Sequence, residues 1–337
     1  MARRRGPFDR PGPDDYADLA NSSINAFLRL RRPAQLAIVA LCIIVGIVGL
    51  VIYFHGQTWS SRNQAAGNPN LLLGNPSRAT DSPANFDNYL MVKPYFVLSY
   101  NSTKGTPNWV SWRVTADDLG HAPRKQVFDE DNSLPPGLSV VNTRDYSGSG
   151  FDRGHMCPHD DRAANEQMSF ATFVMTNIIP QAPNVNQKAW AQLESYCREL
   201  VRLGDRLYII SGPAGQGGRG SRGFKQTIGH GKVTVPAECW KIVVVVESNA
   251  GSDDLAAISM GTRVIAVDMP NDQDVVGEEW DQYRTSPAQI EQKTGLHFFD
   301  RVRPDVAAAL RQRVDDVSIP PPRPMRYERN EGPDHGG

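Results

Sequence analysis

The sequence has few cysteines and no excess of charge of either sign, and each shortage excludes a class of protein. Four cysteines occur in 337 residues. None belongs to a Cys-x-x-Cys pair, which argues against a structural zinc site. The formal net charge is −1, and because residues 1–55 carry +3 and residues 318–337 carry 0, residues 56–317 carry −4. A nucleic-acid ligand would therefore need a local basic groove, because the domain as a whole is not basic.

One long uncharged apolar run lies near the N-terminus. Leu36 to Phe54 spans nineteen residues, follows Arg29, Arg31 and Arg32, and is long enough to cross a bilayer as a helix. The arginines predict a cytosolic N-terminus and a single-pass anchor, with the rest of the chain on the far, periplasmic or extracytoplasmic side. A cleaved signal peptide and a buried core helix are the alternatives, and the length and position of the run disfavour the signal peptide.

Composition divides the chain into five segments. Residues 1–33 are predicted to be a disordered cytosolic tail, 34–55 a transmembrane helix, 56–88 a linker with a lead-in loop, 89–317 the folded domain, and 318–337 a disordered tail rich in proline and arginine.

The folded domain is dominated by short runs of aromatic and β-branched residues. Strands are predicted at 95–100, 109–114, 171–175, 207–211, 240–246 and 264–267, and helices at 186–203, 286–294 and 306–314. Many short strands with few helices predict an α+β domain built around an antiparallel sheet.

His155 ends a turn-like segment of small and charged residues, with Asp152 and Arg153 just before it. A neutral imidazole with a pKa near 6.5 can take a proton from water at neutral pH. A structural histidine is the alternative, and the company of two charged residues favours a site.

The helix predicted from Asn186 carries two polar residues at the edge of its apolar face. On a helical wheel, Asn186 and Glu194 lie within about 40° on either side of Trp190, so both can point into one site. Arg198 follows Glu194 by four residues, a spacing at which side chains interact. The alternative is a helix cap at Asn186 and a surface Glu–Arg pair.

Several blocks resemble the DNA/RNA non-specific endonucleases, the ββα-metal finger superfamily with mitochondrial and secreted bacterial members. Asp152–Met156 is similar to the DRGH signature of that family. Further similar blocks follow in family order, namely Tyr95–Asn101 and Trp109–Trp112 (early hairpin), Met175–Gln181 (strand end), Asn186–Glu194 (helix), and Pro236 with Trp240-Lys241 (later strand). The resemblance extends from about residue 89 to residue 300 and implies a ββα-metal finger within the α+β fold.

The resemblance implies a metal-dependent nuclease that cuts DNA, RNA or both without sequence preference and leaves 5′-phosphate ends. By this likeness His155 is the general base, Asn186 is the direct protein ligand of Mg²⁺ (or of another divalent ion such as Mn²⁺), and Glu194 holds metal-bound water. A homodimer is also consistent with the likeness.

The same resemblance implies roles for four further residues. Arg153 and Asn177 would support the site and the scissile phosphate, Arg198 would lie near the leaving side of the phosphate, and Lys93 would contact substrate.

Three features leave alternatives open. His159 is interpreted as a surface histidine. Cys157 and Cys197 either pair in an oxidising compartment or stay free. Arg219 and Arg222 lie in a glycine-rich loop that either grips a nucleic-acid backbone or is plainly solvated. Two other functions compete with the nuclease: a catalytically silent envelope protein that binds polyanions, and a phosphodiesterase with a smaller substrate.

Overall fold

The computed structural model describes most of the chain, in two compact units, residues 1–63 and 64–337. The described residues are 22, 27–28, 31–37, 39–41, 43–49, 67–275 and 279–319. Most of the predicted N-terminal tail, residues 50–66 of the predicted helix end and linker, and residues 320–337 of the predicted C-terminal tail lie outside them.

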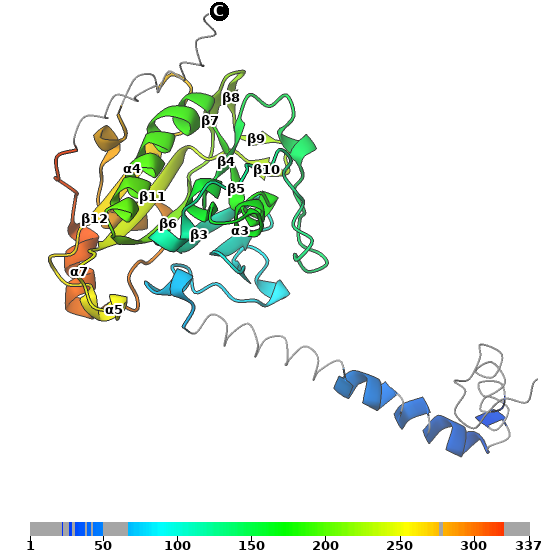
Figure 1. Cartoon of the computed structure of the whole chain (residues 1–337). Coiled ribbons are helices and arrows are strands. Elements are labelled where there is room, and N and C mark those ends of the chain that lie inside the picture. The colour runs from blue at the N-terminus through cyan, green and yellow to red at the C-terminus, as the bar shows by residue number, and fades with distance from the viewer. Residues whose placement is uncertain are drawn as a thin grey trace, which may run out of the picture. The chain divides into compact units, whose positions relative to one another are not determined.

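The N-terminal unit contains an apolar helix (Figure 1, blue). Its window Arg32–Gly49 has a mean hydropathy of 2.0, and none of it is buried. By length and composition it could cross a membrane, although a signal sequence would meet the same criteria.

The second unit is built on a six-stranded sheet whose neighbouring strands are all antiparallel, so the predicted antiparallel sheet is confirmed. The strand order is β1 (Tyr89–Val92), β2 (Val97–Asn101), β3 (Thr106–Val114), β6 (Arg206–Ala214), β11 (Glu238–Val246) and β12 (Val264–Pro270).

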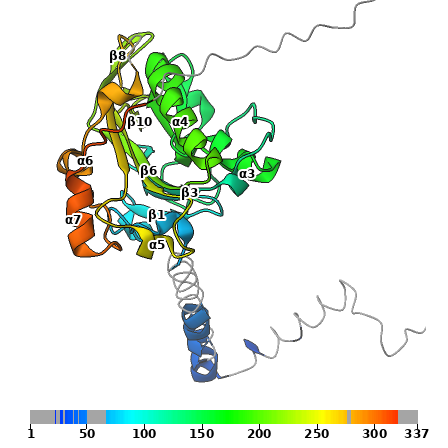
Figure 2. The ribbon, with the colours of Figure 1, turned by 60° about the vertical axis from the view of Figure 1, so that its left-hand side comes forward.

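Both faces of this sheet are buried, which explains why its central strands are continuously apolar. Along β11 successive side chains enter opposite cores: Cys239 and Val243 pack on one face, and Trp240 and Ile242 on the other. The first core is covered by α4 (Trp190–Arg202). The second is covered by α6 (Pro287–Thr294), α7 (Pro304–Gln312) and residues 71–79. Figure 2 shows α6 and α7 on one side of the sheet and α4 on the other.

Smaller elements surround this sandwich. They are the two-stranded sheets β4 (Asp152–His155) with β5 (Ile178–Gln181), β7 (Gly218–Gly220) with β8 (Gly223–Lys225), and β9 (Thr227–Ile228) with β10 (Val233–Thr234), and the helices α3 (Glu166–Ala171) and α5 (Asp254–Ala257). Short 3₁₀ helices occupy Pro69–Leu71, Pro83–Asn85, Ala116–Asp118, Thr143–Tyr146, His159–Arg162, Met175–Asn177 and Trp280–Tyr283, and a π-helical turn occupies Val185–Ala189.

Two predicted elements differ from the structure. The segment 171–175 is not a strand: α3 ends at Ala171, a 3₁₀ turn begins at Met175, and the strand β5 follows. A short buried apolar run does not by itself distinguish a strand from other buried structure. The glycine-rich segment 212–223 is not only a loop, since it contains the end of β6 and the hairpin strand β7.

The folded body begins before residue 89. Leu71, Leu73 and Ala79 belong to the second core. Asn70 is tied to β3, because its side chain accepts a hydrogen bond from the backbone of Arg113 at 3.0 Å. Residues 69–88 therefore add packing to the sheet as well as leading into it.

Candidate active site

The DRGH segment forms β4, and its pairing with β5 fixes the positions of its side chains. Asp152 faces Gln181 and His155 faces Ile178 in the register. Arg153 and His155 are two residues apart on a strand, so they project from the same face. Gly154 allows a close approach, because a Cβ atom there would lie 2.0 Å from Gln181 Oε1.

Arg153 and His155 open into a pocket of about 320 Å³ that also receives side chains from the π turn and α4. It brings together five of the predicted site residues: Arg153, His155, Asn186, Glu194 and Arg198. The remaining lining residues are Arg124, Pro158, His159, Asp160, Gln187, Ala191 and Ser195.

His155 is held by aromatic packing. Its ring centroid lies 4.8 Å from that of Phe173, edge-on, and 5.2 Å from that of Phe128. Burial, with smaller contributions from Arg124 and His159, lowers the pKa of His155 to about 3. The imidazole is therefore neutral at physiological pH. Its Nε2 atom is buried and has no hydrogen-bond partner among the described residues.

Asn186 lies on the π turn, where the helix is wider than an α-helix because the Trp190 N–H donates to Val185 O, five residues back. Its Nδ2 donates to Asp152 Oδ2 at 2.9 Å, and Gln187 Nε2 donates to the same oxygen at 2.8 Å. The Asn186 amide is thus oriented through its nitrogen. Its oxygen accepts no hydrogen bond from the part of the chain that the structure describes and is available to a ligand.

Glu194 is paired with a buried lysine. Lys241 Nζ donates to Glu194 Oε1 at 3.2 Å, and Lys241 is only 1% exposed. The ammonium lies 4.2 Å from the ring centroid of Trp190 and 5.7 Å from that of Trp112. These cation–π contacts offset part of the free-energy cost of burying the charge. Burial raises the pKa of Glu194, opposed by the charges of Lys241 and Arg198.

Arg198 is held by two neighbouring carboxylates. Its Nη1 lies 3.2 Å from Asp161 Oδ1 and its Nη2 lies 3.6 Å from Asp160 Oδ2. His159 Nε2 lies 2.8 Å from Asp160 Oδ1, and this hydrogen bond lowers the pKa of Asp160 to about 2. His159 lines the pocket and its side chain is only 13% exposed, so its interpretation as a surface histidine was wrong.

Known proteins resemble this chain in both sequence and fold. The sequence profile of the DNA/RNA non-specific endonucleases matches residues 73–305. The chain belongs to this family. A nuclease of Nostoc sp. is 45% identical over 246 residues, which is 73% of this chain and 86% of that protein. Members of the family are hydrolases, and the chain is accordingly an endonuclease.

Two more distant relatives agree. Mitochondrial nuclease EXOG of Danio rerio is 35% identical over 209 residues, covering 60% of this chain and 58% of that protein. A solved structure of the EndoG/EndoGI complex superposes with a TM-score of 0.57 at 24% identity, covering 69% of this chain and 91% of that chain. At this identity the superposition supports the fold alone.

The structure of this endonuclease does not bring Asn177 or Lys93 to the pocket. Asn177 is fully buried: its Nδ2 donates to Cys157 O and Thr172 O, and its Oδ1 accepts from Cys157 N. It fixes the backbone just after His155, and the expected contact with the phosphate has no support here. Lys93 Nζ lies 2.7 Å from Asp131, which neutralises that carboxylate.

Arg153 reaches the pocket and is anchored at its tip. Its Nη2 donates to Thr143 O at 2.9 Å, and its guanidinium lies 5.8 Å from the Phe128 ring centroid. Arg124, which the sequence did not single out, adds a second exposed guanidinium to the pocket, 5.3 Å from the Phe173 ring centroid. No motif contains Arg124, so no sequence signal indicated it.

Lys241 and Asp152 were quoted in motifs but were given no role. A lysine within the apolar run of β11 was a usable signal, because a charge at a buried strand position requires a partner. Of the two alternatives left open for Cys157 and Cys197, the structure shows free thiols, and both are buried.

The donor atoms of the pocket suit a hard divalent cation. The Asn186 amide oxygen and the Glu194 carboxylate are oxygen ligands, and Mg²⁺ takes few protein ligands and retains water. No group of three or more His, Cys, Asp or Glu side chains suited to a metal occurs within the described residues. The amide and carboxylate oxygens present could hold such an ion through one or two side chains, with water as the remaining ligands.

Proposed function

We propose that this endonuclease hydrolyses phosphodiester bonds in DNA, RNA or both without sequence preference, depends on a divalent metal ion, and leaves 5′-phosphate ends. One observation carries the proposal: a neutral, buried His155 and an Asn186 oriented by Asp152 line the same small pocket, together with three arginines.

Asn186 would hold the ion through its amide oxygen, and Glu194 would hold it through bound water. In this arrangement β4, β5 and α4 form the ββα-metal finger. Mg²⁺ is the expected ion, and Mn²⁺ is an alternative of similar chemistry. When bound, the ion supplies positive charge that stabilises the phosphate and the departing 3′ oxygen.

His155 acts as the general base and takes a proton from the attacking water. A pKa of about 3 in the free protein ensures an unprotonated imidazole but makes it a weak base. A bound phosphodiester places a negative charge beside the ring, and such a charge favours the protonated form. Substrate binding therefore raises the basicity of His155 when the proton has to be accepted.

Arg153 and Arg124 supply positive charge to the pocket, which suits the phosphate of a nucleic acid, and Arg198 lies beside them paired with Asp160 and Asp161. Contacts to phosphate position a nucleic acid but do not distinguish bases. This explains a nuclease with little sequence preference, although the chain as a whole carries no net positive charge.

The apolar run, residues 36–54, anchors the protein in a membrane with its N-terminus in the cytosol and residues 56–337 on the other side. The hydropathy of Arg32–Gly49 and the preceding arginines support this placement. In spheroplasts, added protease should digest the endonuclease domain, and protection that is lost only after the inner membrane is permeabilised would contradict the orientation. Light scattering of the solubilised protein tests the expected homodimer.

Full-length protein, purified in detergent, should be incubated with supercoiled plasmid and with RNA, with and without Mg²⁺ or Mn²⁺, beside His155→Ala. Metal-dependent degradation that falls by roughly 10²–10⁴-fold in the variant supports the proposal. Cleavage that survives the substitution excludes His155 as the base. No cleavage of either polymer, with turnover of a nitrophenyl nucleotide ester, would indicate the small-substrate phosphodiesterase, and binding without any turnover the silent polyanion-binding protein.

A further inference from the structure

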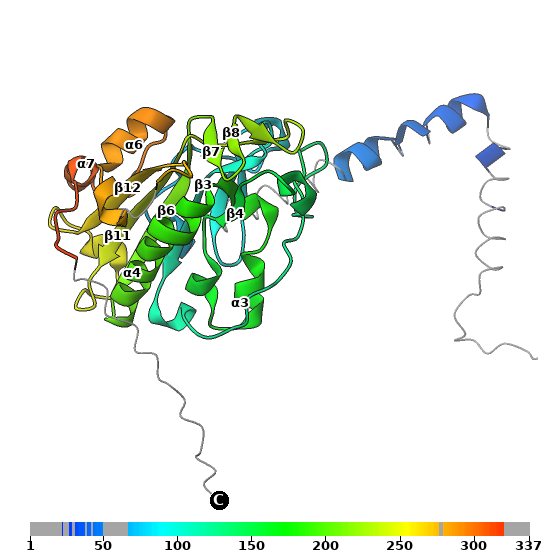
Figure 3. The same ribbon diagram turned by 90° about the horizontal axis from the view of Figure 1, so that it is seen from above.

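The hairpin β7–β8 is attached to the segment that leads into the catalytic strand. Ser221 donates through its backbone N–H to Gly150 O at 2.9 Å, and through its Oγ to the same oxygen at 3.2 Å. Gly150 precedes Asp152 by two residues. Figures 1 and 3 both show β7 and β8 beside β4.

The contact between the two segments is backbone against backbone. Gly150 has a φ of +88°, and a Cβ there would lie 2.7 Å from Arg222 N. A Cβ on Gly220 would lie 2.4 Å from Gly150 O. The two backbones therefore approach closely at Gly150 and Gly220, with the side chains of Arg222 and Phe151 beside the contact, and this approach holds the hairpin against the segment that leads into β4.

The other side of the hairpin is tied to the start of the site's helix. Arg219 N donates to Asn271 O at 3.0 Å, and Gln273 N donates to Arg219 O at 2.7 Å. The Asn271 side chain is buried and accepts from Ala182 N at 2.7 Å, four residues before Asn186. The hairpin thus borders both segments that carry the proposed base and metal ligand.

The hairpin carries three cations, of which one is paired with carboxylates. Arg219 is paired with Asp272 and Asp274, at 3.8 and 3.4 Å. Arg222 and Lys225, by contrast, form no ion pair with an acidic residue in the described part of the chain. Phe224, which lies between them in the sequence, is 58% exposed. An exposed aromatic residue flanked by cations is typical of surfaces that bind nucleic acid.

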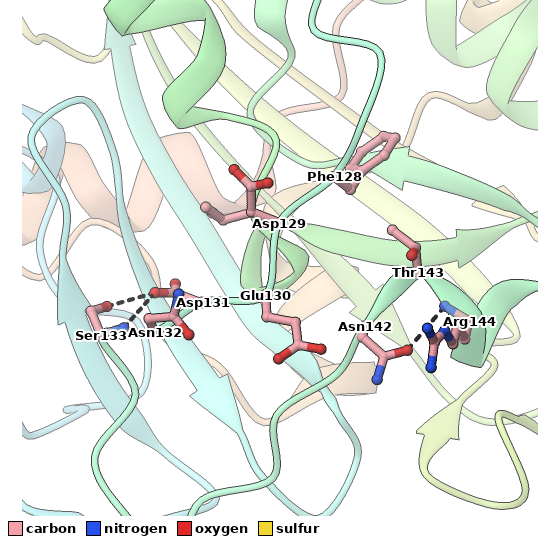
Figure 4. Close-up of a pocket in the computed structure, with 10 residues that line it drawn as sticks. Phe128, Asp129, Glu130, Asp131, Asn132, Ser133, Asn142, Thr143 and Arg144 are labelled. Atoms are coloured by element: carbon pink, nitrogen blue, oxygen red, sulfur yellow. Dashed lines mark hydrogen bonds between the residues drawn. The ribbon is translucent and has the colours of Figure 1, made fainter.

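A larger cleft lies beside Phe128, the ring that packs on His155, and its acidic residues are mostly paired. It has a volume of about 780 Å³ and is lined by Phe128, which packs on His155, and by Asp129, Glu130 and Asp131 (Figure 4). Only Arg144 contributes a cation to its lining. Asp131 is paired with Lys93 and Asp129 with Lys125, which leaves Glu130 as the carboxylate of this lining without an ion pair in the described part of the chain. The cleft therefore offers a phosphate backbone less unpaired positive charge than the hairpin does.

We propose that the β7–β8 hairpin binds the phosphate backbone of the nucleic acid beyond the scissile bond, through Arg222 and Lys225. This inference rests on the proposed nuclease function and adds to it the surface along which a polymeric substrate lies. It also explains how a domain of net negative charge can bind a polyanion.

Binding of a fluorescent single-stranded oligonucleotide should be measured by anisotropy over a range of salt concentrations, using full-length protein with His155→Ala to prevent cleavage. The variant Arg222→Gln/Lys225→Gln should bind more weakly. The slope of log K against log salt should also become shallower by roughly 0.7 for each lost phosphate contact. The charge-keeping variant Arg222→Lys/Lys225→Arg should retain the slope.

Arg301→Gln/Arg303→Gln is the matched control. It removes two exposed cations near the start of α7, on the other side of the sheet from α4. Equal slopes for the hairpin variant and this control would overturn the inference. Because binding is measured without turnover, that outcome differs from failure of the proposed function, in which the unmodified protein would cleave neither plasmid nor RNA.

Discussion

Asn186 Nδ2 donates to Asp152 Oδ2, 2.9 Å away, so the amide of the proposed metal ligand is oriented by the first residue of the DRGH strand. A side-chain amide can present either nitrogen or oxygen to a site. The carboxylate accepts only, and it therefore selects the orientation that leaves the amide oxygen for a cation.

Replacing Asp152 by alanine should weaken metal activation. Without the carboxylate, the Asn186 amide is free to rotate, and loss of such an outer partner typically costs roughly 10–100-fold in metal affinity. The measurement is nuclease activity against Mg²⁺ concentration. Gln187→Ala, which removes the other donor to the same oxygen, is the control and should shift the curve much less. Equal curves for both variants would contradict a special role for Asp152.

Replacing Lys241 by methionine should destabilise the fold and reduce activity. The substitution leaves the carboxylate of Glu194 half-buried and unpaired, and breaking a buried ion pair costs up to about 3–5 kcal/mol, with the lower end expected because Glu194 is 14% exposed. Urea unfolding measures the loss. The double variant Lys241→Met/Glu194→Gln should regain stability but not activity, because the metal-facing carboxylate stays absent. Recovery of activity in the double variant would show that Glu194 is dispensable.

The stability of the protein should fall in acid because of His155. Its folded-state pKa of about 3 is below the unfolded value near 6.5, so below pH 6.5 the unfolded chain binds the additional proton. The contribution is fully present above about pH 6.5 and is lost as the pH falls toward 3, and the loss reaches roughly 3 kcal/mol at about pH 4. Unfolding of wild type and His155→Phe should be compared at several pH values. Parallel pH dependences would mean that the ring is not desolvated.

Gly154→Ala should be destabilising by about 1–3 kcal/mol, the usual cost of inserting a methyl group into packed structure. The new Cβ would lie 2.0 Å from Oε1 of the fully buried Gln181. Thermal unfolding measures the change. Gly251→Ala is the control, because nothing lies within 4 Å of a Cβ there. A melting temperature unchanged by Gly154→Ala would show that β4 can separate from β5 at low cost.

Much of the fold follows from patterns within single segments. The apolar strands, the helix after Asn186 and the antiparallel arrangement were all predictable, because hydrophobic period and strand length are local properties. The placement of 171–175 was not, since a buried apolar run fits several backbone conformations. Residues 69–88 were predicted to be linker because the few residues that enter the core are scattered among polar residues in the sequence.

The candidate site was predictable to the extent that it depends on motif residues. The helical wheel placed Asn186 and Glu194 near one face, and both line the pocket, although Asn186 reaches it from a π turn that a regular wheel does not describe. Lys241 pairs with Glu194 across 47 residues of sequence, and no local pattern specifies such a pairing. Arg124 reaches the pocket from a loop with no motif at all.

The proposed base and the residue that orients the proposed metal ligand lie on the same short strand. Asp152, which aims Asn186, and His155 are the two ends of β4, a strand of four residues held to β5 at every position. Any rigid displacement of β4 moves Asp152 and His155 together, so movements of the surrounding loops leave the distance between these two residues unchanged. The DRGH tetrapeptide is therefore a fixed length of backbone that would keep the proposed proton acceptor in register with the residue that orients the proposed metal ligand.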